Sequence, residues 1–347
     1  MTTNKRKLTT WQIAKPSLLP VINGVLSAAL LGWGIWYLTK ELNLVDIKNA
    51  LAAAKIMPIV LGLGTILVTL LLKAWRWQIL FQPKTDKPPL LAAFWAMMLG
   101  QFVNTAVSFL RIGEVARVYA LQQQTGLSKV RSLGTLVVEK SLELLALLIT
   151  LIVILPFAIV PDVITHQGVT LGILTAVLIT GLLITAYQTP RIIKLLEWLA
   201  PHLPQFIASR LIRWGIAGLE GVASLKNIKT LLPIIATTAL IALSAITTPW
   251  VLFAAFGLPF GPVEAALVHL ITTVASVLPV PIPARLGFFE AAVIFMLAQL
   301  QISNDALSLS YALVFHLVVI LPQITLGALA ASRTKWHWQK TLSTLDS

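Results

Sequence analysis

Long apolar runs recur along this sequence and restrict what the chain can fold into. A helix needs about 20 consecutive apolar residues to cross the hydrocarbon core of a bilayer. Of the 347 residues, 57% are hydrophobic and only 11% are charged, whereas a soluble domain has about 25% charged residues. The sequence therefore predicts an all-α integral membrane protein. Its predicted full spans are residues 17–39, 58–81, 132–155, 168–187, 231–256 and 305–330.

Basic residues predict the orientation of these spans. The formal net charge of +13 would suggest a nucleic-acid partner in a soluble protein, but here Lys and Arg cluster in loops between apolar runs. By the positive-inside rule, loops 82–88, 126–131 and 188–229 face the cytoplasm. Loops 156–167 and 257–262 have no Lys or Arg and face outside. We therefore expect a multi-pass protein of the cell membrane, with both termini cytoplasmic and no nucleic-acid partner.

Polar segments are short, so we expect one membrane domain over residues 1–347 without a separate soluble catalytic domain. The first span follows a basic N-terminal segment and has no obvious cleavage site, which predicts a retained helix rather than a signal peptide. Residues 188–229 form the one sizeable polar loop and place Arg and Trp among leucines. This composition predicts amphipathic helices that lie on the cytoplasmic membrane surface.

Two regions, 91–124 and 262–301, resemble each other. Arg111-Ile112-Gly113 in the first matches Arg285-Leu286-Gly287 in the second, and a short helical pattern follows each motif. Each region has one long span before it and another after it. The sequence therefore predicts an internal repeat, with one copy at about 58–155 and the other at about 231–330.

The basic loops on either side of 91–124 indicate a re-entrant hairpin. A single crossing by 91–110 would place the two basic loops on opposite sides, and the helix after Arg111 is too short to cross back. We predict that this hairpin enters from the cytoplasm and turns near Arg111. The second enters from outside near residue 262 and turns near Arg285, where three prolines prevent regular helix.

Six full spans and two re-entrant hairpins would form an inverted repeat, an architecture that many transporters use. Non-helical backbone at such a depth is tolerated where protein buries it or where it lines a wet cavity. The alternative is eight or more simple spans.

Charged residues inside these apolar regions are the candidates for function. Arg111, Glu114 and Arg117 have the spacing of one helix face. Glu139 and Glu143 are four residues apart on the next span, and two such carboxylates need cationic partners or protons inside a membrane. We predict a buried Arg/Glu network, which has two interpretations: it pins the hairpin to its neighbours, or it lines a substrate path.

The second interpretation suits a phosphate-bearing lipid headgroup, because an arginine fork can make two parallel hydrogen bonds to phosphate. Gln101 and Asn104 would line the pocket or bond to hairpin backbone, and His316 would carry protons or be structural. The predicted substrate-binding residues are Arg111, Glu114, Arg117, Glu139, Glu143, Arg285, Glu290, Asn104, Gln101 and His316.

Other polar residues receive simpler interpretations. Lys73 and Arg76 are predicted to snorkel to the interface beside Trp75 and Trp77, and His269 is predicted to be structural or interfacial. The chain has no cysteine, and its histidines lack metal-ligand spacing. Neither a phosphate-binding glycine loop nor a nucleophile motif occurs. We therefore expect no metal, no cofactor and no enzymatic activity.

Five motifs together resemble the lysylphosphatidylglycerol synthase transmembrane-region family, also called flippase-like domain proteins. They are RWQIL at 76–80, RIGEVAR at 111–117, VVEKSLELL at 137–145, PIPARLGFFEAA at 281–292 and His316. The resemblance covers about 15–330. It implies a lipid flippase, since in multiple-peptide-resistance proteins such a domain translocates aminoacylated phosphatidylglycerol made by a cytosolic domain. That cytosolic domain is not expected here, so the resemblance implies translocation and not lysyl transfer.

Three positions depart from the family's usual pattern. Phe109 stands where a proline usually precedes the first motif's arginine, and Lys140 stands where an arginine often follows the glutamate. The second motif, usually rich in Pro-Gly-Gly, reads Pro283-Ala284-Arg285. Because Arg285 changes the charge of the pocket, the headgroup preference of other members does not carry over.

The sequence thus favours a flippase for a phospholipid, an aminoacyl-phosphatidylglycerol or a polyprenyl-phosphate-linked glycan. Its partners would be membrane lipids with anionic or phosphate-bearing headgroups. A non-transporting scaffold or regulator is the alternative. A third hypothesis, an enzyme acting on lipid phosphate, would have to use Glu139, Glu143 and His316.

Overall fold

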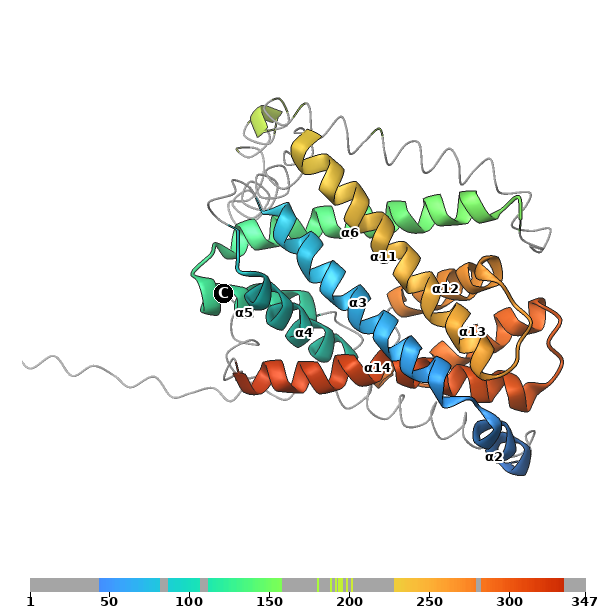
Figure 1. The fold of residues 1–347 in the computed structure, drawn as a ribbon. Helices are drawn as coiled ribbons and strands as arrows, with labels where there is room; N and C mark the ends of the chain where they lie inside the picture. Colours follow the sequence, from blue (N-terminus) through green and yellow to red (C-terminus); the bar gives the residue numbers. More distant parts are fainter. Residues whose placement is uncertain are drawn as a thin grey trace, which may run out of the picture.

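The computed structural model describes residues 44–81, 87–106, 112–157, 228–278 and 282–333, with a few isolated positions between 180 and 201. Within these residues the chain is helical and contains no strand, which confirms the predicted all-α class (Figure 1). The predicted spans 17–39 and 168–187, and nearly all of the predicted surface segment 188–229, lie outside the described residues.

Four long helices form the frame: α3 (Ile56–Leu80), α6 (Lys129–Ile154), α11 (Ile228–Ala255) and α14 (Asp305–Arg333). Their bounds match the four predicted spans in these regions to within three residues. Of the described helices, three are long and apolar enough to cross a membrane, namely Ile56–Leu80, Lys229–Ala255 and Asp305–Arg333. Helix α6 is as long, but Glu139, Lys140 and Glu143 interrupt its apolar sequence.

Two helical hairpins fill the regions that the sequence singled out. The first is α4 (Leu90–Ala106) followed by α5 (Gly113–Thr125), and the second is α12 (Pro262–Val277), the short 3₁₀ helix η4 (Pro283–Arg285) and α13 (Phe288–Gln299). A short helix α2 (Leu44–Ala53) precedes the frame and packs against α14.

Glycines bring the two arms of the first hairpin together. A Cβ atom on Gly100 would lie 2.7 Å from the carbonyl oxygen of Gly113 and 2.9 Å from the Cβ of Arg117. A Cβ atom on Gly113 would lie 2.5 Å from the Asn104 side chain. Since residues later in α5 face residues earlier in α4, the arms run antiparallel and their outer ends lie at one end of the molecule (Figure 1).

Helices α3 and α11 pack along their length in opposite directions (Figure 1). The hydroxyl groups of Thr65 and Thr248 are 2.8 Å apart, and those of Thr69 and Ser244 are also 2.8 Å apart. Later residues of one helix thus meet earlier residues of the other.

The other helices pack on both sides of α3 and α11. The first hairpin packs on α14 through α4, while the second packs on α6 through α12. Helix α3 contacts α14, and α11 contacts α6. The contacts of α4 and α3 with α14 therefore correspond to the contacts of α12 and α11 with α6.

Apolar side chains of the described residues form two large buried clusters, one near each hairpin, and a smaller third cluster that includes Ile79, Val138 and Ile234. One surrounds Trp77, Met98 and Leu121 near the first hairpin. The other surrounds Phe253 and Tyr311 near the second hairpin. Large apolar side chains also cover the outside of the long helices, as expected for a surface that meets lipid rather than water.

Candidate functional site

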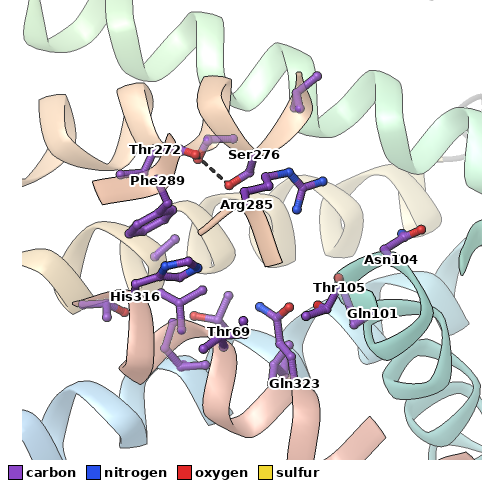
Figure 2. Close-up of a pocket in the computed structure, with 18 of the residues that line it drawn as sticks. Thr69, Gln101, Asn104, Thr105, Thr272, Ser276, Arg285, Phe289, His316 and Gln323 are labelled. Carbon is purple, nitrogen blue, oxygen red and sulfur yellow. Dashed lines mark hydrogen bonds between the residues drawn. The ribbon is translucent and has the colours of Figure 1, made fainter. Parts of the chain in front are cut away.

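A polar cavity of about 270 Å³ lies between the two hairpins (Figure 2). Its wall combines both hairpins with all four long helices, so residues far apart in the sequence meet there. Three basic side chains and two carboxylates are among the described lining residues. The polar lining comprises Thr69, Lys73, Gln101, Asn104, Thr105, Glu114, Lys140, Glu143, Thr248, His269, Thr272, Thr273, Ser276, Arg285, His316 and Gln323.

Glu143 is the centre of the charged network at this cavity. Its carboxylate lies 3.6 Å from the Lys73 ammonium, 3.3 Å from the Arg76 guanidinium and 2.9 Å from the Lys140 ammonium. Lys140 also lies 3.4 Å from the carboxylate of Glu114 on the first hairpin. The basic side chains of α3 and α6 are thereby held next to the cavity by two carboxylates.

Arg285 extends from the tip of the second hairpin. Figure 2 shows its side chain reaching from η4 toward the side of the cavity where Asn104 and Thr105 lie. The backbone at Ala284 and Arg285 is left-handed, with φ of 54° and 57°. Non-glycine residues adopt this conformation at a cost of about 1 kcal/mol or more each, and such strain concentrates at functional sites.

Asn104 links the cavity wall to the turn of the first hairpin. Its side-chain oxygen accepts a hydrogen bond from the backbone N–H of Gly113 at 2.8 Å, one of the N–H groups left without a partner at the start of α5. Gln101 lies one turn earlier on α4 and also lines the cavity. Both interpretations of Asn104 therefore hold together: it bonds to hairpin backbone and lines the pocket.

His316 and Glu290 connect α14 to the start of α13. The two side chains form a hydrogen bond of 2.7 Å, and the second carboxylate oxygen of Glu290 accepts a bond of 2.8 Å from the Gly287 N–H. The His316 ring stacks on Phe289 with centroids 4.4 Å apart. His316 and Phe289 line the cavity, whereas Glu290 lies behind them and supports them.

Arg117 and Glu139 lie away from the cavity. Their two parallel hydrogen bonds measure 3.0 and 2.9 Å, and both side chains are buried. The guanidinium also covers the Trp77 ring at 3.6 Å from its centroid, and the indole N–H of Trp77 donates to Thr135 at 2.9 Å. These contacts anchor α5 to α3 and α6.

The sequence matches a known protein family over most of its length. The family described as "Lysylphosphatidylglycerol synthase TM region" matches residues 24–327. The chain belongs to this family. It is therefore a multi-pass membrane protein related to lipid metabolism or transport. A search of curated proteins found no match.

In this family member, seven of the ten residues predicted to bind substrate either line the cavity or support its lining. Arg111 lies outside the described residues, and the pair Arg117–Glu139 is buried elsewhere. The described cavity residues do, however, include charges from both hairpins and from α6. The seven residues that line or support the cavity are Gln101, Asn104, Glu114, Glu143, Arg285, His316 and, behind His316, Glu290.

The interpretation of Lys73 and Arg76 as snorkelling residues was wrong. The Arg76 side chain is only 1% exposed and pairs with Glu143, and Lys73 lines the cavity. Both side chains turn inward because the carboxylate of Glu143 on α6 lies opposite them. Of the two tryptophans, Trp75 is exposed and Trp77 is buried. His269 likewise faces the cavity.

Hydroxyl residues of the cavity were missed in the sequence, although a signal was present. On α3, Thr65, Thr69, Lys73 and Arg76 recur every three or four residues, which is the spacing of one helix face. On α12, His269, Thr272 and Ser276 have the same spacing. A polar stripe within an apolar span indicates a face turned away from lipid.

Among the described residues, no group of three His, Asp or Glu could hold a metal ion.

The backbone at the tip of the second hairpin is left-handed at residues 284 and 285. Glycine would adopt this conformation without strain, because it lacks a Cβ atom. Here Ala284 and Arg285 occupy these positions. The strained backbone thus places the guanidinium of Arg285 at the cavity.

Proposed function

We propose that the protein is a lipid flippase that moves a phosphate-bearing lipid between the leaflets of the cell membrane. The observation that carries this proposal is the polar cavity between the two hairpins. It holds Lys73, Lys140 and Arg285 inside a bundle whose outer surface is apolar. Ionisable groups at such a depth are costly and commonly mark substrate paths.

The short arms of the hairpins support a re-entrant arrangement. Helix α5 has 13 residues and α13 has 12, so at 1.5 Å per residue each is about 20 Å long. The hydrocarbon core is about 30 Å thick. We therefore place the two hairpin tips inside the membrane, next to the cavity, rather than at its far surface.

Opposite directions of α3 and α11 support an inverted repeat, with α3–α6 as one copy and α11–α14 as the other. Movement of one copy against the other would open the cavity alternately to each side. The positive-inside rule then places both termini in the cytoplasm.

Within this mechanism, Arg285, Lys73 and Lys140 would bind the phosphate group of the lipid. Glu143 and Glu114 hold the ammonium groups in position while the cavity is empty, and they exchange these contacts for contacts with a headgroup. Translocation makes and breaks no covalent bond, so the proposal assigns no catalytic residue.

The test is translocation of fluorescent phosphatidylglycerol in liposomes that contain purified protein, with dithionite bleaching the outer leaflet. An arginine–phosphate contact contributes about 1.5–3 kcal/mol, so Arg285→Gln should slow translocation about tenfold. Arg285→Lys keeps the charge and should retain more activity. Equal rates for wild type and Arg285→Gln would contradict the proposed role of Arg285.

A non-transporting scaffold is the second candidate, because one observation favours it. Glu143 is already paired with three cations, and Arg117 is paired with Glu139. A scaffold would use these pairs only to join helices. Absence of translocation for phosphatidylglycerol, its aminoacyl forms and a polyprenyl phosphate would favour this candidate over the flippase.

A further inference from the structure

A second hollow lies beside the polar cavity and has the opposite character. It is an apolar groove of about 480 Å³ along α6, bordered on the α5 side by Glu114. Its apolar lining on α6 includes Val130, Leu133, Gly134, Val137 and Leu144. With Lys140 and Ser141, these residues fall three, four or seven positions apart, so they occupy one face of α6. Val137 and Leu144 are 54% and 46% exposed, which makes this an outer, lipid-facing surface.

The groove and the polar cavity meet at one ion pair. Glu114 and Lys140 line both hollows, and their charged atoms are 3.4 Å apart. Their side chains are 28% and 43% exposed, so neither is locked in the protein interior. An apolar surface thus leads directly to a basic group and from there into a polar cavity.

Such a juxtaposition matches an amphipathic ligand. A phosphate beside Lys140 would replace Glu114 as its partner, while a hydrocarbon chain attached to that phosphate would cover the apolar groove. Both halves of the ligand would be satisfied at once, since the charge stays hydrogen-bonded and the chain stays in apolar surroundings.

The length of the groove favours one class of chain. From Lys140, where the phosphate would lie, α6 extends about 15 Å to Val130 at the end of the groove, and one leaflet of the hydrocarbon core is also about 15 Å thick. A chain confined to one leaflet, such as the acyl chain of a glycerophospholipid, fits this length. A long polyprenyl chain would extend well beyond it.

We propose that the groove along α6 binds an acyl chain of a glycerophospholipid whose phosphate enters the cavity between Glu114 and Lys140. This inference rests on the proposed function for the identity of the headgroup site. It further proposes that the lipid enters from the outer face of α6. The headgroup would have to break the ion pair between Glu114 and Lys140.

The test is retention of phosphatidylglycerol by the purified full-length protein, measured by native mass spectrometry. Val137→Trp fills the groove and should reduce bound lipid about tenfold. Val153→Trp is the matched control, because Val153 lies on the same helix, is 59% exposed and is outside the groove. It should retain lipid as wild type does. Leu144→Trp provides a second groove variant if Val137→Trp unfolds.

The outcomes separate this inference from the flippase proposal. Lipid lost from the groove variants alone supports the groove, even where wild type shows no translocation, in which case only the flippase proposal fails. Normal translocation with lipid retained by both groove variants overturns the groove. Equal loss in Val153→Trp overturns it as well. The groove proposal is also overturned if the wild-type protein retains polyprenyl phosphate but no phosphatidylglycerol.

Discussion

At the scale of single residues, Arg117 shows how a charge can be buried in an apolar bundle. Its guanidinium makes two hydrogen bonds to Glu139 and lies on the face of Trp77. A buried pair of this kind contributes little net stability over an apolar pair, but removal of one partner leaves an uncompensated charge. Arg117 and Glu139 therefore depend on each other.

We expect Glu139→Leu to lower the free energy of unfolding by about 3–5 kcal/mol. The double variant Arg117→Met/Glu139→Leu should recover most of this loss, because it removes both charges. Unfolding of the purified protein in detergent measures both effects. The pair does not line the cavity, so the double variant should still translocate lipid. A stable but inactive double variant would show that the pair belongs to the transport path.

At the scale of elements, the first hairpin depends on the close approach of α4 and α5. Gly100 and Gly113 allow their backbones to touch, and Asn104 bonds across the turn. Similarly, Gly327 brings α14 onto α4, because a Cβ atom there would lie 2.9 Å from the carbonyl oxygen of Met98. Small residues permit such contacts between membrane helices.

Gly113→Ala should therefore destabilise the protein by about 1–3 kcal/mol, the usual cost of overpacking. Gly64→Ala on α3 is the matched control, since a Cβ atom there meets nothing within 4 Å and alanine favours helix over glycine. It should be neutral or slightly stabilising. Thermal unfolding of the two variants compares them directly, and equal midpoints would contradict the packing argument.

Element bounds could be predicted from the sequence because bilayer thickness fixes the length of an apolar span. The sequence patterns around Arg111 and around the prolines near Arg285 likewise located the two pairs of short helices, α4 with α5 and α12 with α13. Side-chain directions could not be predicted in the same way. Arg76 has the composition of an interfacial residue, and only its contact with Glu143 on another helix turns it inward. The hydroxyl stripes of α3 and α12 became a cavity wall only when these helices were placed together.

At the scale of the whole molecule, the proposed inverted repeat predicts which side of the membrane each hairpin faces. The chain has no cysteine, so single cysteines can be introduced without removing others. Pro89→Cys and Gln124→Cys, at the outer ends of the first hairpin, should react with an impermeant maleimide from the cytoplasmic side. Pro259→Cys and Ser303→Cys flank the second hairpin and should react from outside. Labelling of Gln124→Cys and Pro259→Cys from the same side would contradict the inverted repeat.

The central claim is that lipid headgroups pass through the polar cavity between the hairpins. Gln323→Cys places the protein's single thiol in this cavity, and Ile324→Cys places it on the exposed side of the same helix. We would measure phosphatidylglycerol translocation in liposomes before and after a bulky methanethiosulfonate reagent, and again after reduction. We expect a reversible block of translocation in Gln323→Cys and no effect in Ile324→Cys. Unchanged translocation by fully modified Gln323→Cys would contradict it.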